Sequence, residues 1–125
     1  MELNLNNITF IIVSFKSEKI IDDCLKSLPK NSKIIVIENS NNYNLKKSLE
    51  LKYDNIEVLI SENNGMGASN NLGILKSETK FAYVLNPDVK FKKDTFENLI
   101  TAAIKITDFA ILTPINSDIK FPNFK

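Results

Sequence analysis

The residues best suited to bind a ligand form four short polar clusters, each directly after an apolar run. They combine carboxylate, amide and hydroxyl side chains with bare glycine backbone, and they are Ser14-Phe15-Lys16, Glu38-Asn39-Ser40, Asn63-Asn64-Gly65-Met66-Gly67 and Asn86-Pro87-Asp88. A carboxylate accepts hydrogen bonds from a base N–H or a ribose hydroxyl. Glycine backbone lets a phosphate or a sugar approach closely. Together these groups suit a ligand that carries hydroxyls and phosphates.

Most of these residues also have an ordinary structural interpretation. Glu38 could equally be a solvated residue at the start of a loop, and Gly65 and Gly67 could be turn residues. Asn70 and Asn71 stand where a helix favours Ala or Leu. They are therefore either cap or turn residues, or side chains that hold the neighbouring loop.

The cluster Asn86-Pro87-Asp88 has two interpretations as well. All three residue types favour turns, yet Asp88 follows an apolar run that we expect to be a central strand, where a carboxylate is well placed to hold a divalent cation. The chain has no His, which removes the commonest transition-metal ligand. Any metal bound here should therefore be a hard cation held by oxygen, such as Mg²⁺ or Mn²⁺, and Asp88 is its candidate ligand if the cluster is not a plain turn.

The elements that must position these clusters alternate along the chain. Apolar runs predict strands at residues 8–15, 34–37, 56–60, 81–85 and 109–113, with apolar residues at helical spacing between them. This alternation predicts an α/β fold with a mostly parallel sheet and helices on both faces. We expect residues 8–15 to be central and residues 56–60 to form an edge strand. Because ligands bind at the carboxyl ends of the strands in such sheets, all four clusters should share one end of the sheet.

The predicted helices carry further local signals. Ser17 is expected to cap the first helix, and Asp94 with Glu97 forms a capping-box pattern for the fourth. In the third helix, the predicted inner face consists of Ala68, Leu72 and Leu75.

Composition and charge limit the class of protein. With 125 residues, of which 43% are hydrophobic and 25% charged, the chain is expected to form one domain over residues 1–125. A net charge of +1 argues against a nucleic-acid partner. The first apolar run, residues 8–15, lacks the features of a secretory signal or a membrane span, so we expect a cytoplasmic location. Cys24 lies on an apolar helix face and is expected to be a buried structural thiol.

Five sequence blocks resemble family 2 glycosyltransferases, above all the branch that contains bacterial rhamnosyltransferases. The blocks are residues 11–15 (IIVSF), 24–28 (CLKSL), 36–40 (VIENS), 63–74 (NNGMGASNNLGI) and 85–89 (LNPDV). The resemblance covers about residues 8–115, and the last two blocks, in this order and spacing, are its most specific part.

This resemblance implies a three-layer, Rossmann-like GT-A fold and a sugar transfer that inverts the anomeric centre. The donor would be a nucleotide-diphosphate sugar such as a UDP- or dTDP-sugar, used in polysaccharide biosynthesis. Glu38 would contact the base or the ribose, and Asp88 would bind the metal. The residues implied in nucleotide-sugar binding are Ser14, Phe15, Glu38, Asn39, Asn64, Gly65, Gly67, Asn70, Asn71, Asn86 and Asp88.

The chain departs from the family pattern in three ways. Glu38 replaces the usual Asp and is longer by a methylene, and Asn86 replaces the first Asp of the usual Asp-x-Asp, which removes one negative charge. The third departure is length: the chain is expected to stop after about the fifth strand, before a carboxylate general base and an acceptor site. We therefore predict no catalytic residue in it. Its expected partners are a missing C-terminal half or a membrane-associated glycan acceptor, the latter at the inner face of the membrane.

Two other functions are compatible with an α/β domain of this size. One is a non-catalytic or degenerate nucleotide-sugar-binding module, which would share the same site. The other is a receiver-like signalling domain, which needs an acidic pair after its first strand and a phosphoacceptor Asp after its third. The chain has Ser14-Phe15-Lys16 and Ser61-Glu62-Asn63 at these places, which argues against a receiver.

Overall fold

The computed structural model describes residues 3–106 and 108–113. These residues belong to two compact units, one that ends at Phe91 and one that begins at Lys92. The single domain expected over residues 1–125 stays a prediction.

The first unit is a parallel α/β sheet. Its elements in chain order are a 3-10 helix Leu5–Asn7, β1 (Ile8–Ser14), α1 (Ile21–Ser27), β2 (Lys33–Glu38), α2 (Tyr43–Lys52), β3 (Ile56–Ile60), α3 (Met66–Lys76) and β4 (Phe81–Leu85). The strand order is β3-β2-β1-β4, and every neighbouring pair is parallel. The predictions of a parallel sheet, of a central first strand and of an edge position for residues 56–60 are therefore confirmed.

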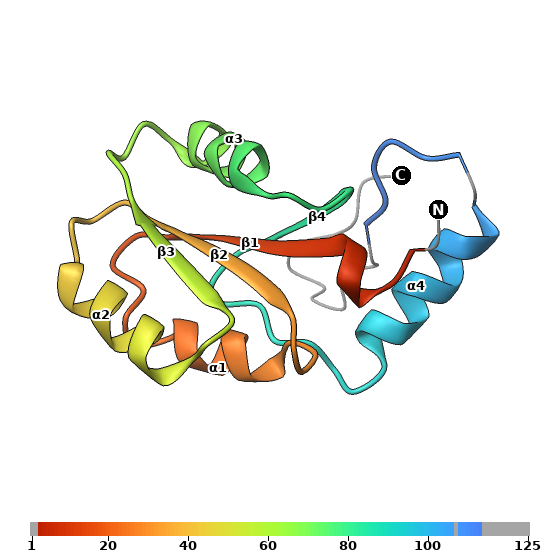
Figure 1. Ribbon diagram of the computed structural model, residues 1–125, viewed down its shortest axis with the longest axis horizontal. Coiled ribbons are helices and arrows are strands. Elements are labelled where there is room, and N and C mark those ends of the chain that lie inside the picture. Colours follow the sequence, from red (N-terminus) through yellow and green to blue (C-terminus); the bar gives the residue numbers. More distant parts are fainter. Residues whose placement is uncertain (1–2, 107, 114–125) are drawn as a thin grey trace, which may run out of the picture. The chain divides into compact units, whose positions relative to one another are not determined.

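Helices cover both faces of this sheet. In Figure 1, α3 lies on one face, while α1 and α2 lie on the other. All seven residues of β1 are buried, because this strand has a neighbour on each side and helices above and below. A continuous apolar run is the sequence pattern that such a strand requires.

The third helix packs on the sheet through Leu72, which lies against the core residues Val13, Ile35 and Ile37, and through two small residues. Its buried residues are Ser69 and Gly73, whereas Leu75 is 82% exposed and Ala68 is exposed. A Cβ added to Gly73 would lie 2.4 Å from Ile11 Cγ2, so the close approach of α3 to β1 depends on glycine. The predicted inner face was right for Leu72 and wrong for Ala68 and Leu75, because the spacing of apolar residues does not detect packing through Ser69 and Gly73.

The fourth strand differs from the central strand that its apolar composition predicts. Its burial alternates, and Val84 is 42% exposed. In the described part of the sheet, β4 has β1 as its only neighbour. An apolar run indicates burial, but it does not specify how many strands lie beside it.

Both predicted helix caps were wrong. The Ser17 hydroxyl donates a 3.1 Å hydrogen bond to the Phe15 carbonyl, and α1 begins four residues later without a side-chain cap. In the second unit, Asp94 precedes α4 (Thr95–Lys105), but its side chain makes no capping bond. A capping residue typically has extended backbone, whereas Asp94 has φ −105° and ψ 4°.

The fifth predicted strand, residues 109–113, is not a strand in the structure. The described residues of the second unit contain α4 and irregular chain only. A strand forms only where a partner supplies a ladder of backbone hydrogen bonds, and the described sheet consists of β3, β2, β1 and β4, without residues 109–113.

Candidate functional site

The four polar clusters of the first unit lie at one end of its sheet. Because all the strands are parallel, their carboxyl ends coincide: Ser14 is paired with Glu38, and Glu38 with Ile60. The last residue of β4, Leu85, is paired with Ile12 of β1. The chain leaves the sheet toward α1, α2 and α3 from this carboxyl end (Figure 1).

The loop after β2 is organised around the Glu38 carboxylate. Glu38 is fully buried. Its Oε2 accepts hydrogen bonds from the backbone N–H of Ser40 (2.8 Å) and of Asn42 (2.9 Å), and its Oε1 accepts from the Ser40 hydroxyl (2.6 Å). A carboxylate has about four acceptor positions, so three of them are used by the protein's own loop.

The loops after β1 and β2 are joined to each other. The backbone N–H of Lys16 donates to Ser40 Oγ (3.1 Å), and the N–H of Asn39 donates to the Ser14 carbonyl (2.8 Å). The Phe15 side chain is 48% exposed, and Lys16 Nζ lies 5.3 Å from its ring centroid. This arrangement presents an aromatic ring and a cation at the carboxyl end of the sheet.

The loop after β2 is also joined to α3. Asn39 Nδ2 donates to Ser69 Oγ at 2.6 Å, and both residues are buried. Two buried polar atoms here, Asn39 Oδ1 and Ser14 Oγ, have no hydrogen-bond partner among the described residues. Buried polar atoms are nearly always paired in native proteins, so these two retain unused hydrogen-bonding capacity beside the loops.

The glycine-containing loop after β3 begins α3. Gly65 stands at the N-cap position with φ +97°, a conformation that side chains other than glycine rarely adopt. Asn64, Gly65 and Gly67 are exposed, and a Cβ at Gly65 or Gly67 would contact nothing within 4 Å. The glycines therefore leave open space at the surface. Gly65 is a helix N-cap and Gly67 lies inside α3, so the turn interpretation is confirmed for neither.

The two adjacent asparagines lie inside α3. Asn70 is half-buried and Asn71 is exposed, both well within the helix. The cap or turn interpretation of these residues is therefore wrong, and their place in the nucleotide site stays a prediction.

The cluster after β4 is an exposed turn. The Val89 N–H donates to the Asn86 carbonyl (3.1 Å), which closes the turn, and the Asn86 and Asp88 side chains are exposed. The Cys24 thiol lies behind the turn, 3.8 Å from the same carbonyl. Burial, with the nearby Asp88 charge, raises the pKa of Cys24 to about 11. The thiol is therefore unreactive at neutral pH, as predicted for a structural cysteine.

Asp88 is a single carboxylate, not part of a preformed metal cage. No group of three or more acidic, Cys or His side chains able to hold a metal is present in residues 3–106 and 108–113. Mg²⁺ keeps several waters and is commonly bound by one or two carboxylates together with substrate phosphates. The exposed Asp88 fits such a shared site, in which the ligand itself supplies further oxygens.

Two side chains that shape this end of the sheet were given no role from the sequence: Ser40, named only as a member of its polar cluster, and Ser69. Ser40 connects Glu38 to Lys16, and Ser69 connects α3 to Asn39. The sequence did carry a local signal for Asn42, whose N–H also binds Glu38. Asn is a favoured helix cap, and the Asn42 side chain accepts a hydrogen bond from the N–H of Leu45 at the start of α2. Ser69 gave no such signal, because its partner lies thirty residues away in the sequence.

Comparisons with known proteins agree with this architecture. The pattern of glycosyl transferase family 2 matches residues 9–125. The low-salt glycan biosynthesis hexosyltransferase Agl10 of Haloferax volcanii is 29% identical over 115 residues, which cover 88% of this chain and 36% of Agl10. The chain thus spans about a third of that relative.

Two crystal structures of TarS from S. aureus share the fold. The structure of TarS residues 1–349 superimposes with a TM-score of 0.66 at 22% identity, over 79% of this chain and 32% of TarS 1–349. A second TarS structure gives 0.63 at 18% identity, over 79% of this chain and 20% of that one. At this identity the likeness shows the fold alone, and it confirms the predicted α/β class. No helix among the described residues is both long and apolar enough to span a bilayer.

Proposed function

The chain belongs to glycosyl transferase family 2, and from this membership we propose that it binds a nucleotide-diphosphate sugar at the carboxyl end of its sheet. The observation that carries the proposal is the convergence of four polar clusters at that end of a wholly parallel sheet. Open α/β sheets bind ligands at this place.

The proposed binding site has two parts. The exposed Phe15 ring and the neighbouring backbone of Ser14 would receive the nucleoside. The buried Asn39 would support this loop from behind through its hydrogen bond to Ser69. The loop at residues 64–71 would flank the nucleotide, while Asn86 and Asp88 would face the diphosphate and the sugar. A UDP- or dTDP-sugar is the proposed donor, and a rhamnosyl or other hexosyl group is the proposed cargo.

A divalent cation is part of this proposal. Asp88 would hold Mg²⁺ or Mn²⁺ together with the diphosphate, and the ion would supply positive charge to the leaving diphosphate. The protein's own contribution on this side is the turn between Asn86 and Val89, which keeps Asp88 exposed at the end of β4. Lys16, two residues after the end of β1 and beside the Phe15 ring, would be a second source of positive charge for the diphosphate.

Transfer itself is proposed for a protein that also carries an acceptor site and a general base. A carboxylate base would take the proton of the acceptor hydroxyl as it attacks, with inversion of the anomeric centre. Agl10, named for glycan biosynthesis, supports a glycan acceptor, which we propose is reached at the cytoplasmic face of a membrane. We expect these 125 residues alone to bind the donor without appreciable transfer to any acceptor.

Metal-dependent binding tests this function. UDP and dTDP would be titrated into the 125-residue chain with and without Mn²⁺, and into Asp88→Asn, which keeps the shape of the side chain and removes its charge. We expect binding that depends on Mn²⁺ in the parent and largely loses that dependence in the variant. Asp54→Asn is the matched control, because Asp54 is exposed before β3, at the opposite end of the sheet.

The outcomes separate the parts of the proposal. Equal metal-dependent binding by the parent and Asp88→Asn would leave Asn86-Pro87-Asp88 as a plain turn. If neither UDP nor dTDP binds at millimolar concentration, donor binding by this chain is wrong. Binding without metal dependence would favour the second candidate, a non-catalytic nucleotide-sugar module, which the neutral Asn86 in place of an acid also favours.

A further inference from the structure

The carboxylate of Glu38 is directed into its own loop. Glu38 is fully buried, and three donors from the two residues Ser40 and Asn42 occupy its two oxygens at 2.6 to 2.9 Å. A side chain that contacted a base or a ribose would need open acceptor positions at the surface. The geometry instead assigns this acid a task inside the protein.

Ser40 connects Glu38 to the loop after β1 by two hydrogen bonds. The Ser40 hydroxyl donates to Glu38 Oε1 and accepts from the Lys16 N–H. This N–H belongs to the peptide bond that joins Phe15 to Lys16, so the chain of hydrogen bonds ends at the backbone of the exposed Phe15. Glu38 is therefore linked to the proposed nucleoside position indirectly, through the Ser40 hydroxyl and the Lys16 N–H.

The two connected loops contain strained backbone that needs such support. Lys16 has φ +52° and Asn41 has φ +55°, and residues other than glycine adopt this left-handed conformation at a cost. Conformations of this kind persist where the surrounding structure holds them. Lys16 is held by Ser40, and Asn41 lies between the two residues whose N–H groups bind Glu38.

We propose that Glu38 is a positioning residue for the nucleotide site: it holds the Phe15-Lys16 backbone in its ligand-binding form through Ser40 and does not itself contact the nucleotide. This inference rests on the proposed donor binding. The Glu38 side chain brings its carboxylate to the backbone N–H groups of Ser40 and Asn42, and Glu38→Asp would shorten it by one methylene.

Amide exchange and nucleotide titration by NMR on the 125-residue chain test the proposal. The variants are Glu38→Asp, Glu38→Gln, Ser40→Ala and the double variant Glu38→Gln/Ser40→Ala. Each single variant should speed exchange of the Lys16 amide by about tenfold, the typical effect of losing one hydrogen bond in a charge-assisted network. Each should also weaken UDP or dTDP binding by a similar factor, and the double variant should lose no more than the stronger single one.

The direct-contact alternative makes opposite predictions. If Glu38 binds the base or the ribose, Glu38→Asp restores the residue usual at this position and should bind nucleotide as well as the parent or better, with unchanged Lys16 exchange. Ser40→Ala should then have little effect, and its effect should add to that of Glu38→Gln. Either result would overturn the positioning role.

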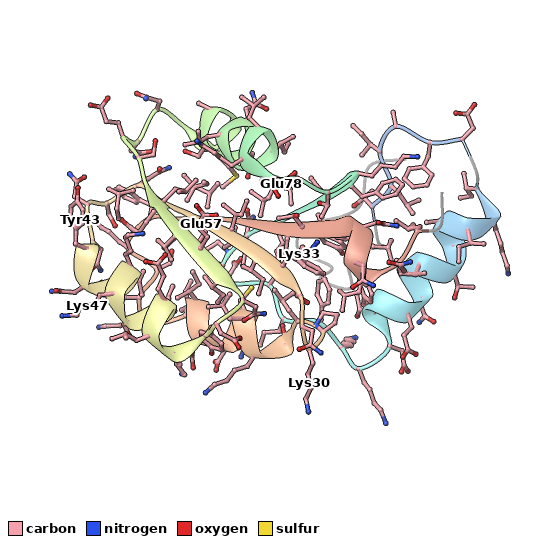
Figure 2. The ribbon with its side chains drawn as sticks, viewed as in Figure 1. Lys30, Lys33, Tyr43, Lys47, Glu57 and Glu78 are labelled. Carbon is pink, nitrogen blue, oxygen red and sulfur yellow. The ribbon has the colours of Figure 1, made fainter. Side chains whose placement is uncertain are left out.

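Two controls keep the outcomes distinct. Glu57→Gln changes an exposed acid on β3 (Figure 2) and should leave Lys16 exchange and nucleotide binding unchanged. Ser40→Ala alters a half-buried loop side chain, so it tests the proposal even if the Glu38 variants fold poorly. If the parent binds no nucleotide, donor binding fails, whereas Lys16 exchange in Ser40→Ala and Glu38→Asp still decides whether Glu38 holds the loop.

Discussion

The loop after β2 and the turn after β4 lie at the same end of the sheet but use their polar residues differently. Glu38 and Asn39 are buried and bonded to neighbouring loops and to α3. Asn86 and Asp88 are exposed, and the turn is closed by the backbone hydrogen bond between Val89 and Asn86 without help from either side chain. The side chains of the first region form hydrogen bonds within the protein, whereas those of the second region are exposed and available to a ligand. The contrast teaches that a polar residue at a strand end binds ligand only if its own fold has not already occupied it.

The largest effect should come from removing the acceptor at the centre of the first loop. Glu38→Ala leaves three donors without their partner, and we expect it to lower the free energy of unfolding by roughly 3 kcal/mol. Urea denaturation followed by circular dichroism would measure the change. Glu57→Ala, on an exposed side of β3, should change it by less than about 0.5 kcal/mol. Equal effects of the two substitutions would remove Glu38 as the organiser of this loop.

A smaller effect should come from the contact between the loop and α3. We expect Asn39→Ala and Ser69→Ala to show a coupling of about 1 kcal/mol in a double-mutant cycle, because each removes the partner of a buried hydrogen bond. The cycle would be measured by the same denaturation. Additive losses would show that the 2.6 Å contact does not stabilise the loop, and would weaken the contrast with the turn after β4.

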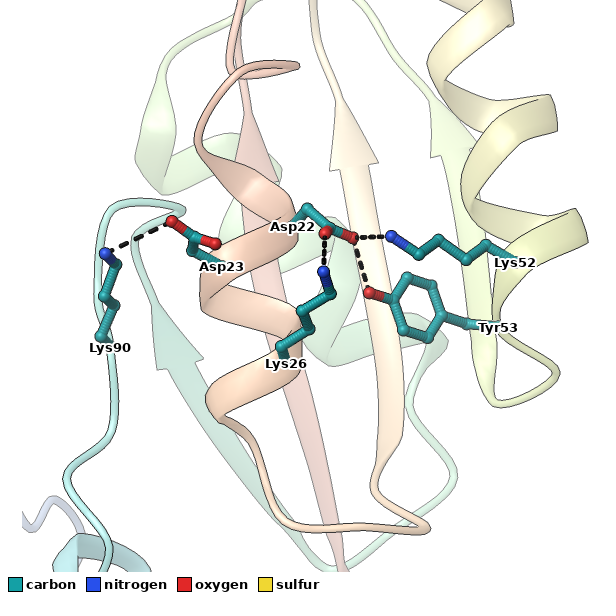
Figure 3. Close-up of polar contacts among 6 residues, drawn as sticks. All are labelled: Asp22, Asp23, Lys26, Lys52, Tyr53 and Lys90. Carbon is teal, nitrogen blue, oxygen red and sulfur yellow. Dashed lines mark hydrogen bonds and ion pairs between the residues drawn. The ribbon is translucent and has the colours of Figure 1, made fainter.

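Asp22, a partly exposed carboxylate with several hydrogen-bond partners, can be compared with the buried Glu38. Asp22 on α1 binds Lys26 (2.8 Å), Lys52 (2.7 Å) and the Tyr53 hydroxyl (2.6 Å), and these contacts join α1 to the end of α2 (Figure 3). The hydrogen bonds from Lys26, then Lys52 and Tyr53, hold the Asp22 pKa well below its usual 3.8. Since this side chain is 33% exposed, we expect the network to contribute less than about 1 kcal/mol.

The pH dependence of that contribution follows from the direction of the shift. A carboxyl with a lowered folded pKa stabilises the protein above its unfolded pKa of 3.8 and loses this stabilisation as the pH falls through the folded value. The difference in unfolding free energy between the parent and Asp22→Asn should therefore be constant above about pH 5 and shrink below pH 4. A difference that grew on acidification would contradict the assignment.

The smallest effect on stability should come from Asp88. Asp88→Asn should change the free energy of unfolding by less than about 0.5 kcal/mol, because its side chain is exposed and the turn is closed by backbone. The same variant should lose metal-dependent nucleotide binding, so function and stability separate at this residue. A loss of stability comparable to that of Glu38→Ala would show that Asp88 holds the turn, and the contrast between the two regions would fail.

Much of the fold could be predicted because local sequence carries its physical cause. Continuous apolar runs required strands covered on both faces, and their alternation with helices required parallel pairing. The shared end of the four clusters followed from that pairing alone. The packing of α3 through Ser69 and Gly73, and the single neighbour of β4 in the described sheet, could not be predicted, because each depends on which distant residues come into contact.

The sequence by itself determined that Glu38 and Asp88 stand at the carboxyl ends of strands, since parallel topology places them there. Only the tertiary structure decided that Glu38 faces inward to three donors while Asp88 faces solvent. The physical reason is that burial and hydrogen-bond partners are set by neighbours from separate segments. Ser69 meets Asn39 across thirty residues of sequence, and Lys16 meets Ser40 across twenty-four. No local pattern records such contacts, and they determine which polar groups remain free to bind a ligand.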